Sequence, residues 1–111
     1  DDNIINNVKF RDSCFEYTKR YFYCYSDKKI IGGCCVIEFF IGIYGISGMA
    51  VSKGQERKGV ATDIIEAIHR RFSGIFLLSS SKAQGFYKKF KYDNYLNTKL
   101  MVRFDEGAVF W

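Results

Sequence analysis

The chain has 111 residues, of which 48% are hydrophobic and 18% are aromatic. This composition excludes an intrinsically disordered chain, and the length suits one domain, residues 1–111, with a single core. The formal net charge of +5 is compatible with an anionic ligand but does not establish nucleic-acid binding. No apolar run approaches the ~20 residues of a membrane-spanning helix, and no basic-then-apolar signal segment opens the sequence, so we expect a cytoplasmic location.

The four cysteines are Cys14, Cys24, Cys34 and Cys35, and they form no Cys-x-x-Cys pair. In a strand, the adjacent Cys34 and Cys35 would point to opposite faces. Their spacing therefore indicates neither a zinc site nor a disulfide framework, and we expect reduced, buried thiols and no metal.

The N-terminal third of the chain contains a predicted strand at Tyr21–Ser26 and a hairpin turn at 27–29. Before it, Asp12 and Ser13 are suited to cap a short helix that runs to Lys19. The almost wholly apolar run Ile30–Ile43 predicts a central strand covered on both faces.

The middle of the chain predicts a strand at Tyr44–Val51, a polar turn, and a helix that opens at Gly59. Helical spacing of apolar residues gives this helix one buried face. Its unpaired N-terminal amides, with the Arg57 and Lys58 side chains beside them, would suit a phosphate group. A single glycine in a basic turn is a weak signal, and an ordinary strand-turn-helix unit with a solvated turn accounts for the spacing equally well.

The last third of the chain predicts a buried parallel strand at Ile75–Leu78 and a second helix after it. Ser81 and Gln84 have the spacing of a capping box at the start of that helix. Residues 97–104 alternate as a final strand, and Gly107–Trp111 would extend the sheet.

The segment Val51–Thr62, VSKGQERKGVAT, resembles the acetyl-CoA pyrophosphate loop of GNAT-superfamily N-acetyltransferases. The pattern of that loop is Gln/Arg-x-x-Gly-x-Gly/Ala. Gly59 and Ala61 fill its last two positions, whereas Glu56 stands where glutamine or arginine is usual.

The segment 83–93, AQGFYKKFKYD, resembles the GNAT segment Ala-x-x-Phe-Tyr-x-x-x-Gly-Phe, which carries a tyrosine near the thioester sulfur. Lys91 replaces the usual glycine, and Ser80 stands where asparagine is common. The two motifs follow each other in the family's order, and the recognisable region runs from about Tyr44 to Tyr92.

This resemblance implies an α/β fold with a mixed, mostly antiparallel sheet of about six strands and three or four helices. Two central strands, ending near Val51 and Leu78, would splay apart to admit the pantetheine arm of acetyl-CoA. The backbone of Met49, Ala50 and Val51 would bind that arm. The remaining cofactor-binding residues would be Arg57, Lys58, Gly59, Val60, Ala61, Thr62, Ser80 and Phe86.

The resemblance further implies transfer of the acetyl group to a primary amine by direct attack in a ternary complex. Tyr87 would be the general acid. Gly45 stands where some members carry a glutamate, so Glu38 or a water ordered by Ser47 would serve as base; a solvent-facing strand end is the other interpretation of Glu38.

Two further hypotheses stay open at this point. One is a non-catalytic acyl-CoA-binding module that regulates a partner protein, and the other is acetylation of a nucleic-acid-borne amine such as aminoacyl-tRNA. The acceptor is an amine-bearing molecule, which includes the possibility of a protein, and the aromatic chain end Val109–Trp111 is suited to pair across a homodimer.

Overall fold

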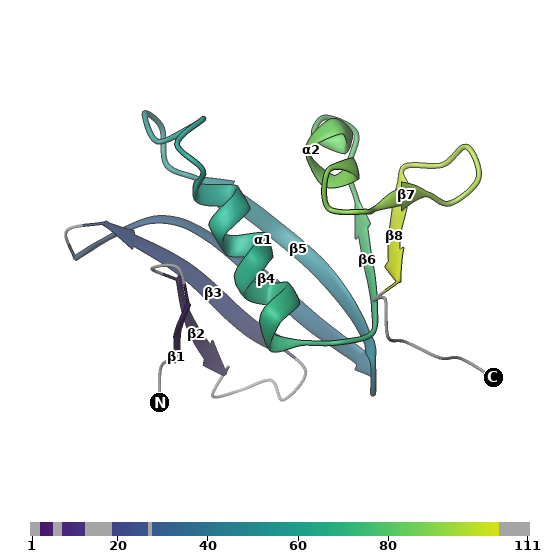
Figure 1. Ribbon diagram of the computed structural model, residues 1–111, viewed down its shortest axis with the longest axis horizontal. Helices are drawn as coiled ribbons and strands as arrows, with labels where there is room; N and C mark the ends of the chain where they lie inside the picture. Colours follow the sequence, from purple (N-terminus) through teal and green to yellow (C-terminus); the bar gives the residue numbers. More distant parts are fainter. Residues whose placement is uncertain (1–2, 6–7, 13–18, 27, 105–111) are drawn as a thin grey trace.

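The computed structural model describes residues 3–5, 8–12, 19–26 and 28–104, and Figure 1 shows their arrangement. They form eight strands and two helices. In chain order the elements are β1 (Asn3–Ile5), β2 (Val8–Asp12), β3 (Lys19–Ser26), β4 (Lys29–Phe40), β5 (Ile43–Val51), α1 (Val60–Arg71), β6 (Ile75–Ser79), α2 (Gln84–Lys88), β7 (Asp93–Asn94) and β8 (Leu100–Phe104).

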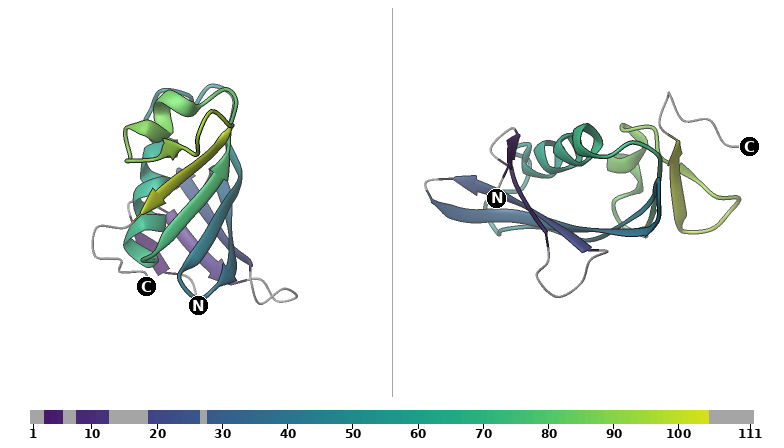
Figure 2. Two further views of the ribbon diagram at one scale, coloured as in Figure 1. Left: turned by 90° about the vertical axis from the view of Figure 1, so that its right-hand side faces the viewer. Right: turned by 90° about the horizontal axis from the view of Figure 1, so that it is seen from below.

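All eight strands belong to one mixed sheet with the order β1-β2-β3-β4-β5-β6-β8-β7. Every neighbouring pair is antiparallel except β5 and β6, which run parallel and are joined through α1. The sheet is strongly curved, and both helices lie on its concave side (Figure 2). This is the α/β fold class expected from the sequence, with two short strands, β1 and β7, among the eight.

The core is packed between α1 and the strands below it. Helix α1 buries Val60, Ile64, Ile65, Ala67 and Ile68, which recur at the spacing of one helix face. Gly32 of β4 lets the helix come close, because a Cβ at that position would lie 2.7 Å from Val60 Cγ1. The start of α1 is therefore fixed against the sheet by a glycine on the facing strand.

The prediction of one strand over residues 30–43, covered on both faces, is wrong. A turn at Ile41 and Gly42 divides the run into β4 and β5, and Gly42 takes the left-handed φ of 81° that the turn requires. Only alternate residues of the middle of β4 are fully buried, because α1 covers one face of the strand. Ile41 at the tip is 97% exposed, so the apolar run conceals a turn.

The remaining expectations are met in part. Strand β3 contains the predicted segment Tyr21–Ser26, and β6 pairs parallel to β5 as expected. Among the cysteines, Cys24 and Cys34 are buried and Cys35 is half-buried, all as free thiols; Cys14 lies outside the described residues. The helix expected to run to Lys19 falls mainly on residues 13–18, also outside, and its ends at Asp12 and Lys19 lie in strands.

The proposed extension at Gly107–Trp111 and the dimer contact at Val109–Trp111 likewise concern residues that are not described. In the part of the chain that the structure describes, no helix is both long enough and apolar enough to cross a membrane.

Candidate acyl-CoA site

Strands β5 and β6 pair along only part of their length. Residues 43–45 of β5 pair with residues 75–77 of β6, and the pairing ends at Gly45 and Leu77. Beyond that point β5 continues to Val51, while β6 pairs on its other side with β8. The edge of β5 from Ile46 onward therefore faces an opening in the sheet, as the predicted splayed pair requires.

A β-bulge on β5 accompanies this opening. Gly33 pairs with Ala50 and Cys35 pairs with Ser47, so two residues of β5, Gly48 and Met49, stand opposite the single residue Cys34. Gly48 has a φ of 65°, a conformation that glycine adopts without strain. Bulges of this kind bend a strand and increase its local twist, which turns the end of β5 away from β6.

The N-terminus of α1 lies beyond the end of β5. Gly59 is its N-cap residue, with a φ of 80°, and no side chain caps the first turn. The Asp63 N–H donates the first intrahelical hydrogen bond, to the Gly59 carbonyl. The backbone amides of residues 60–62 are therefore available to a ligand. Together with the helix dipole, these amides favour an anion at this position.

Two pockets occupy the space between these elements and α2. The loop pocket, about 500 Å³, lies at the start of α1, and the strand pocket, about 510 Å³, lies along the opening between β5 and β6. Lining the loop pocket are Val51, Gln55, Glu56, Arg57, Gly59, Val60, Ala61, Thr62, Phe86 and Lys89. Lining the strand pocket are Ile46, Ser47, Gly48, Met49, Ala61, Leu78, Ser79, Ser80, Ala83, Phe86 and Tyr87.

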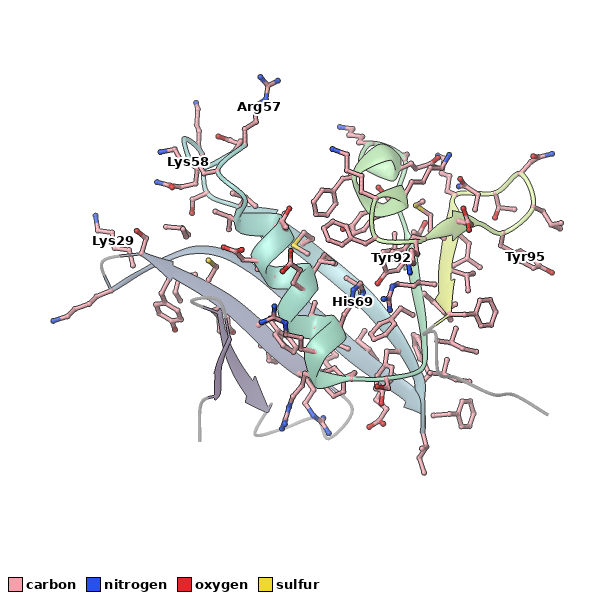
Figure 3. The ribbon with its side chains drawn as sticks, viewed as in Figure 1. Lys29, Arg57, Lys58, His69, Tyr92 and Tyr95 are labelled. Carbon is pink, nitrogen blue, oxygen red and sulfur yellow. The ribbon has the colours of Figure 1, made fainter. Side chains whose placement is uncertain are left out.

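The two pockets form one trough, because Ala61 and Phe86 line both of them. Figure 1 shows the loop before α1 and helix α2 at the same end of the molecule. Most of the sequence-predicted cofactor residues line it. Ala50 and Lys58 line neither pocket; the Lys58 side chain extends from the loop into solvent beside Arg57 (Figure 3).

Glu56, which departs from the family pattern, is used within the loop itself. Its Oε2 atom accepts a hydrogen bond of 2.7 Å from the backbone N–H of Gly54. A second loop bond runs from the Gln55 N–H to the Ser52 carbonyl, at 2.9 Å. The carboxylate thus helps to shape the loop, but it also places a negative charge on the wall of the loop pocket.

Tyr87 reaches the strand pocket from α2. Its side chain is 6% exposed, and burial, followed by the nearby Cys34 thiol, raises the pKa of its hydroxyl above the ordinary value. The hydroxyl is therefore protonated at neutral pH. Because Tyr87 lines the strand pocket, its side chain can donate a proton to a group that binds there.

The start of α2 is held by Ser80 rather than by Ser81, which corrects the predicted capping box. The Ala83 N–H donates to Ser80 Oγ at 3.1 Å, and Gln84 Nε2 donates to the Ser80 carbonyl at 2.8 Å. Helix α2 begins only at Gln84, its N-cap residue is Ala83, and no side chain caps it, so the two Ser80 bonds stabilise the turn that leads into the helix. Ser80 therefore lines the strand pocket while it also orients the helix that carries Tyr87.

The structure does not bring Glu38 to this trough. Glu38 pairs across the sheet with Tyr44 near the β4–β5 turn, and its Oε1 atom lies 3.9 Å from Arg20 Nη2. Ser47 is three residues beyond Tyr44, a distance of roughly 10 Å along a strand. The prediction that Glu38 takes part in catalysis is corrected by this placement, whereas Ser47 does line the strand pocket.

Gly45 shows why a carboxylate is missing from β5. A Cβ built on Gly45 would lie 2.7 Å from the ring of Phe39, on the neighbouring strand. The aromatic ring thus fills the space that a side chain at position 45 would enter.

Sequence reasoning missed Lys89, which lines the loop pocket from the α2 side. The signal was available, since Lys89 follows Phe86 by three residues and such pairs share one helix face. It also missed Leu78 and Ile46, which form the apolar walls of the strand pocket.

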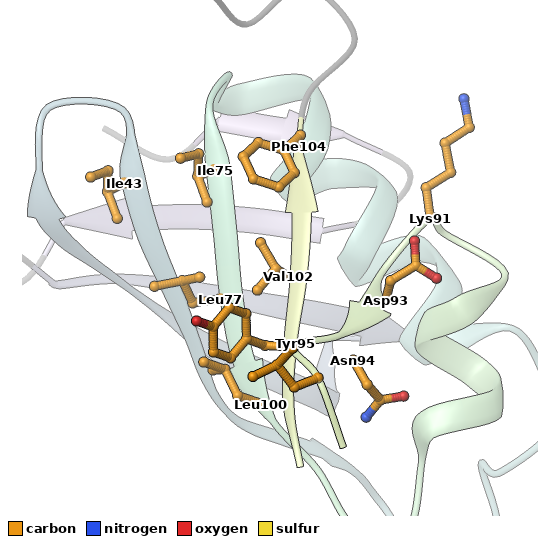
Figure 4. A pocket seen from close by; sticks show the side chains of 11 residues that line it. Ile43, Ile75, Leu77, Lys91, Asp93, Asn94, Tyr95, Leu100, Val102 and Phe104 are labelled. Carbon is orange, nitrogen blue, oxygen red and sulfur yellow. The ribbon is translucent and has the colours of Figure 1, made fainter. Parts of the chain in front are cut away.

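A third pocket, the outer pocket, lies on the opposite face of the sheet (Figure 4). Its volume is about 790 Å³, and its walls include Ile75, Leu77 and Val102. Ile75 and Leu77 alternate along β6 with the buried Phe76 and Leu78, which face α1, so the two faces of the strand serve different pockets.

The sequence comparison identifies the class of protein that this fold and trough define. Residues 18–94 match the family described as the acetyltransferase (GNAT) domain. The match covers more than half of the chain, and the chain therefore belongs to the GNAT family of acetyltransferases. A comparison with curated proteins finds no match.

Three solved structures illustrate the similarity of the fold. The chain is similar to Tetrahymena GCN5, with a TM-score of 0.69, 17% identity, and coverage of 87% of this chain and 74% of that one. It resembles a GNAT acetyltransferase from Staphylococcus aureus, with a TM-score of 0.63, 13% identity, and coverage of 78% and 67%. It also resembles the Bacillus subtilis N-acetyltransferase YlbP in complex with coenzyme A, with a TM-score of 0.66, 10% identity, and coverage of 78% and 68%.

Proposed function

We propose that this chain is an acetyl-CoA-dependent N-acetyltransferase that moves the acetyl group to a primary amine. The observation that carries the proposal is the continuous trough from the uncapped start of α1 to the side chain of Tyr87. One end suits a pyrophosphate and the other suits a thioester. Family membership and the coenzyme A bound by YlbP support the same cofactor.

Acetyl-CoA would lie along the whole trough. The amides of residues 60–62 and the Arg57 side chain would bind the pyrophosphate in the loop pocket. The unpaired edge of β5 at Met49–Val51 would hydrogen-bond the pantetheine arm, in the way that an added strand binds a sheet edge. Phe86, which lines both pockets, would pack against the arm where it passes from one pocket to the other.

The chemical step would be direct attack of the amine on the thioester carbonyl. The new C–N bond forms, the C–S bond breaks, the amine loses a proton, and the thiolate of coenzyme A gains one. Tyr87 would donate that proton, since it is the one ionisable side chain among the described residues that line the strand pocket. A backbone N–H on the β5 edge would polarise the carbonyl oxygen.

The proton of the amine would leave through water at the exposed Ser47 on β5. We assign this role to water because the two candidate carboxylate positions supply no base. Glu38 lies near the β4–β5 turn, and the Phe39 ring occupies the space beside Gly45. Glu38 is therefore not part of the mechanism that we propose.

The test is release of coenzyme A from acetyl-CoA in the presence of a panel of small amines and peptides. We expect amine-dependent release above the rate of hydrolysis, together with an acetylated product detected by mass spectrometry. Complete inertness towards the panel, despite tight binding of acetyl-CoA, would contradict the enzymatic proposal.

A second candidate is a non-catalytic acyl-CoA-binding module, favoured by the aromatic ring that fills the space beside Gly45. It shares the cofactor site with the first proposal but predicts no turnover. A partner protein that is retained on the immobilised chain only when acetyl-CoA is added would support this candidate.

A further inference from the structure

The loop pocket contains a charge that does not suit its proposed ligand. Glu56 lines it, with its carboxylate held by the Gly54 N–H at 2.7 Å. This is the position where the family pattern has glutamine or arginine. A carboxylate beside a pyrophosphate would repel it and would offset the charge of Arg57 in the same pocket, so a further cation would strengthen binding.

The facing wall of the same pocket supplies a cation. Lys89 lines the loop pocket together with Phe86, one turn earlier in α2, and its backbone N–H donates to the Phe86 carbonyl at 3.2 Å. The side chains of Phe86 and Lys89 therefore lie on the same side of this segment. The neighbouring Lys88 is exposed and lines neither pocket of the trough.

The distribution of charge along the chain agrees with this arrangement. The loop residues 52–59 carry a net charge of +2 and the α2 segment 80–92 carries +4, compared with +5 for the whole chain. The excess positive charge is therefore concentrated in the two segments that border the trough, and Arg57 and Lys89 are the cations of these segments that line it. Of the lysines in the α2 segment, Lys89 is the one that lines the loop pocket.

We propose that Lys89 binds the pyrophosphate of the acyl carrier and offsets the carboxylate of Glu56 on the opposite wall. The inference rests on the proposed cofactor site and adds to it a specificity residue that the pyrophosphate motif does not contain. Lys89 selects carriers that have a pyrophosphate over those that end at the pantetheine hydroxyl. Its exposed ammonium acts as a point charge, so its contribution falls as the salt concentration rises.

The first experiment is calorimetric titration of Lys89→Met with three probes: coenzyme A, dephospho-coenzyme A and pantetheine. Methionine keeps the length of the apolar side chain and removes the charge. We expect about ten- to thirty-fold weaker binding of the first two probes, both of which contain the pyrophosphate, and unchanged binding of pantetheine. Lys88→Met is the matched control and should change affinity by less than about twofold.

The second experiment tests the compensation between the two walls. Glu56→Gln keeps an oxygen that can accept the Gly54 N–H but removes the charge, and it should tighten coenzyme A binding several-fold. Because the two charges act on the ligand from separate walls, Glu56→Gln combined with Lys89→Met should return the affinity to within about threefold of wild type. Equal weakness of the double variant and of Lys89→Met alone would contradict the compensation.

The outcomes separate this inference from the proposed function. If wild type binds coenzyme A while Lys89→Met and Lys88→Met behave alike, the role of Lys89 is wrong and the proposed site stands. A loss for coenzyme A that is absent for dephospho-coenzyme A would assign Lys89 to the 3′-phosphate and overturn the pyrophosphate contact. If wild type binds none of the three probes, both proposals are wrong.

Discussion

His69 and Tyr92 connect α1 to the end of the α2 segment, the two helical parts of the chain that contribute walls to the trough. His69 Nε2 in α1 lies 2.8 Å from the hydroxyl of Tyr92, which follows α2, and the two rings are stacked with centroids 5.6 Å apart (Figure 3). Tyr92 is completely buried, and its backbone N–H donates to the Tyr87 carbonyl at 3.3 Å. The position of the proposed acid is therefore linked to α1 through one tyrosine.

Tyr92→Phe should lower the free energy of unfolding by about 1–2 kcal/mol, because it removes the hydrogen bond and leaves a half-buried imidazole nitrogen without that partner. Urea unfolding at pH 7 measures the loss. The exposed Tyr95 provides the control, since Tyr95→Phe should change stability by less than about 0.5 kcal/mol. Equal stability of the two variants would show that the bond does not tie the walls together.

Lys91 lies in the turn that follows α2, in a conformation that usually belongs to glycine. Its φ is 69°, its N–H donates to the Lys88 carbonyl, and the Tyr92 N–H reaches back to Tyr87, which together make a Schellman motif. Lys91→Gly should stabilise the protein by about 0.5–1 kcal/mol, since glycine adopts this conformation without a steric cost. The control is Lys91→Ala, which removes the same charge but keeps a Cβ and should not stabilise; thermal melting compares them.

The unfolding free energy should fall in alkali partly because of the buried Cys34. Burial, followed by the Cys35 neighbour, raises the pKa of the Cys34 thiol to about 12, from about 9. Above pH 9 the unfolded chain releases this proton while the folded chain keeps it. Stability that is fully present below pH 9 is therefore lost at up to about 1.4 kcal/mol per pH unit as the pH rises towards 12.

Cys34→Ala tests this dependence by urea unfolding at pH 7, 9 and 10. The variant should be less stable at pH 7 through lost packing, but its loss between pH 9 and 10 should be smaller than in wild type. Cys24, whose pKa is also raised, accounts for part of the remaining slope. Cys35→Ala removes the neighbour that adds to the shift and should change the slope less than Cys34→Ala does. Identical slopes for wild type and Cys34→Ala would contradict the assignment.

Tyr87→Phe separates packing from catalysis in one substitution. The ring stays in place, so the melting temperature should hardly change, while loss of the proton donor should lower kcat by about 10²-fold and leave acetyl-CoA affinity nearly intact. We expect the lower end of the usual range because a thiolate is a tolerable leaving group. Full activity of the folded variant would leave Tyr87 as a core residue and favour protonation by water.

The sequence was sufficient where a local pattern sets the structure. Apolar spacing locates α1, and Gly59 marks its start because the chain needs a left-handed residue there. At Lys91 the sequence was sufficient only in part. The resemblance to the GNAT segment shows that Lys91 replaces a glycine, and the structure shows that the residue keeps the left-handed conformation.

Features that depend on register could not be obtained from sequence. Three consecutive serines, 79–81, precede α2, and only the structure shows that Ser80 is the one that accepts the Ala83 N–H in the turn before the helix. The distance of Glu38 from the trough depends on which residue it pairs with across the sheet. The turn at Ile41 lacked polar residues, so hydrophobicity indicated a continuous strand.

The most direct test of the account is calorimetric titration of coenzyme A into wild type, Gly59→Ala and Gly59→Glu. A Cβ at Gly59 meets no neighbouring atom within 4 Å, so both variants should fold, with a similar strain from the φ of 80°. We expect wild type to bind, Gly59→Ala to bind more weakly, and Gly59→Glu to lose binding because its carboxylate repels the pyrophosphate at the start of α1. Unchanged affinity in folded Gly59→Glu would contradict the acyl-CoA site.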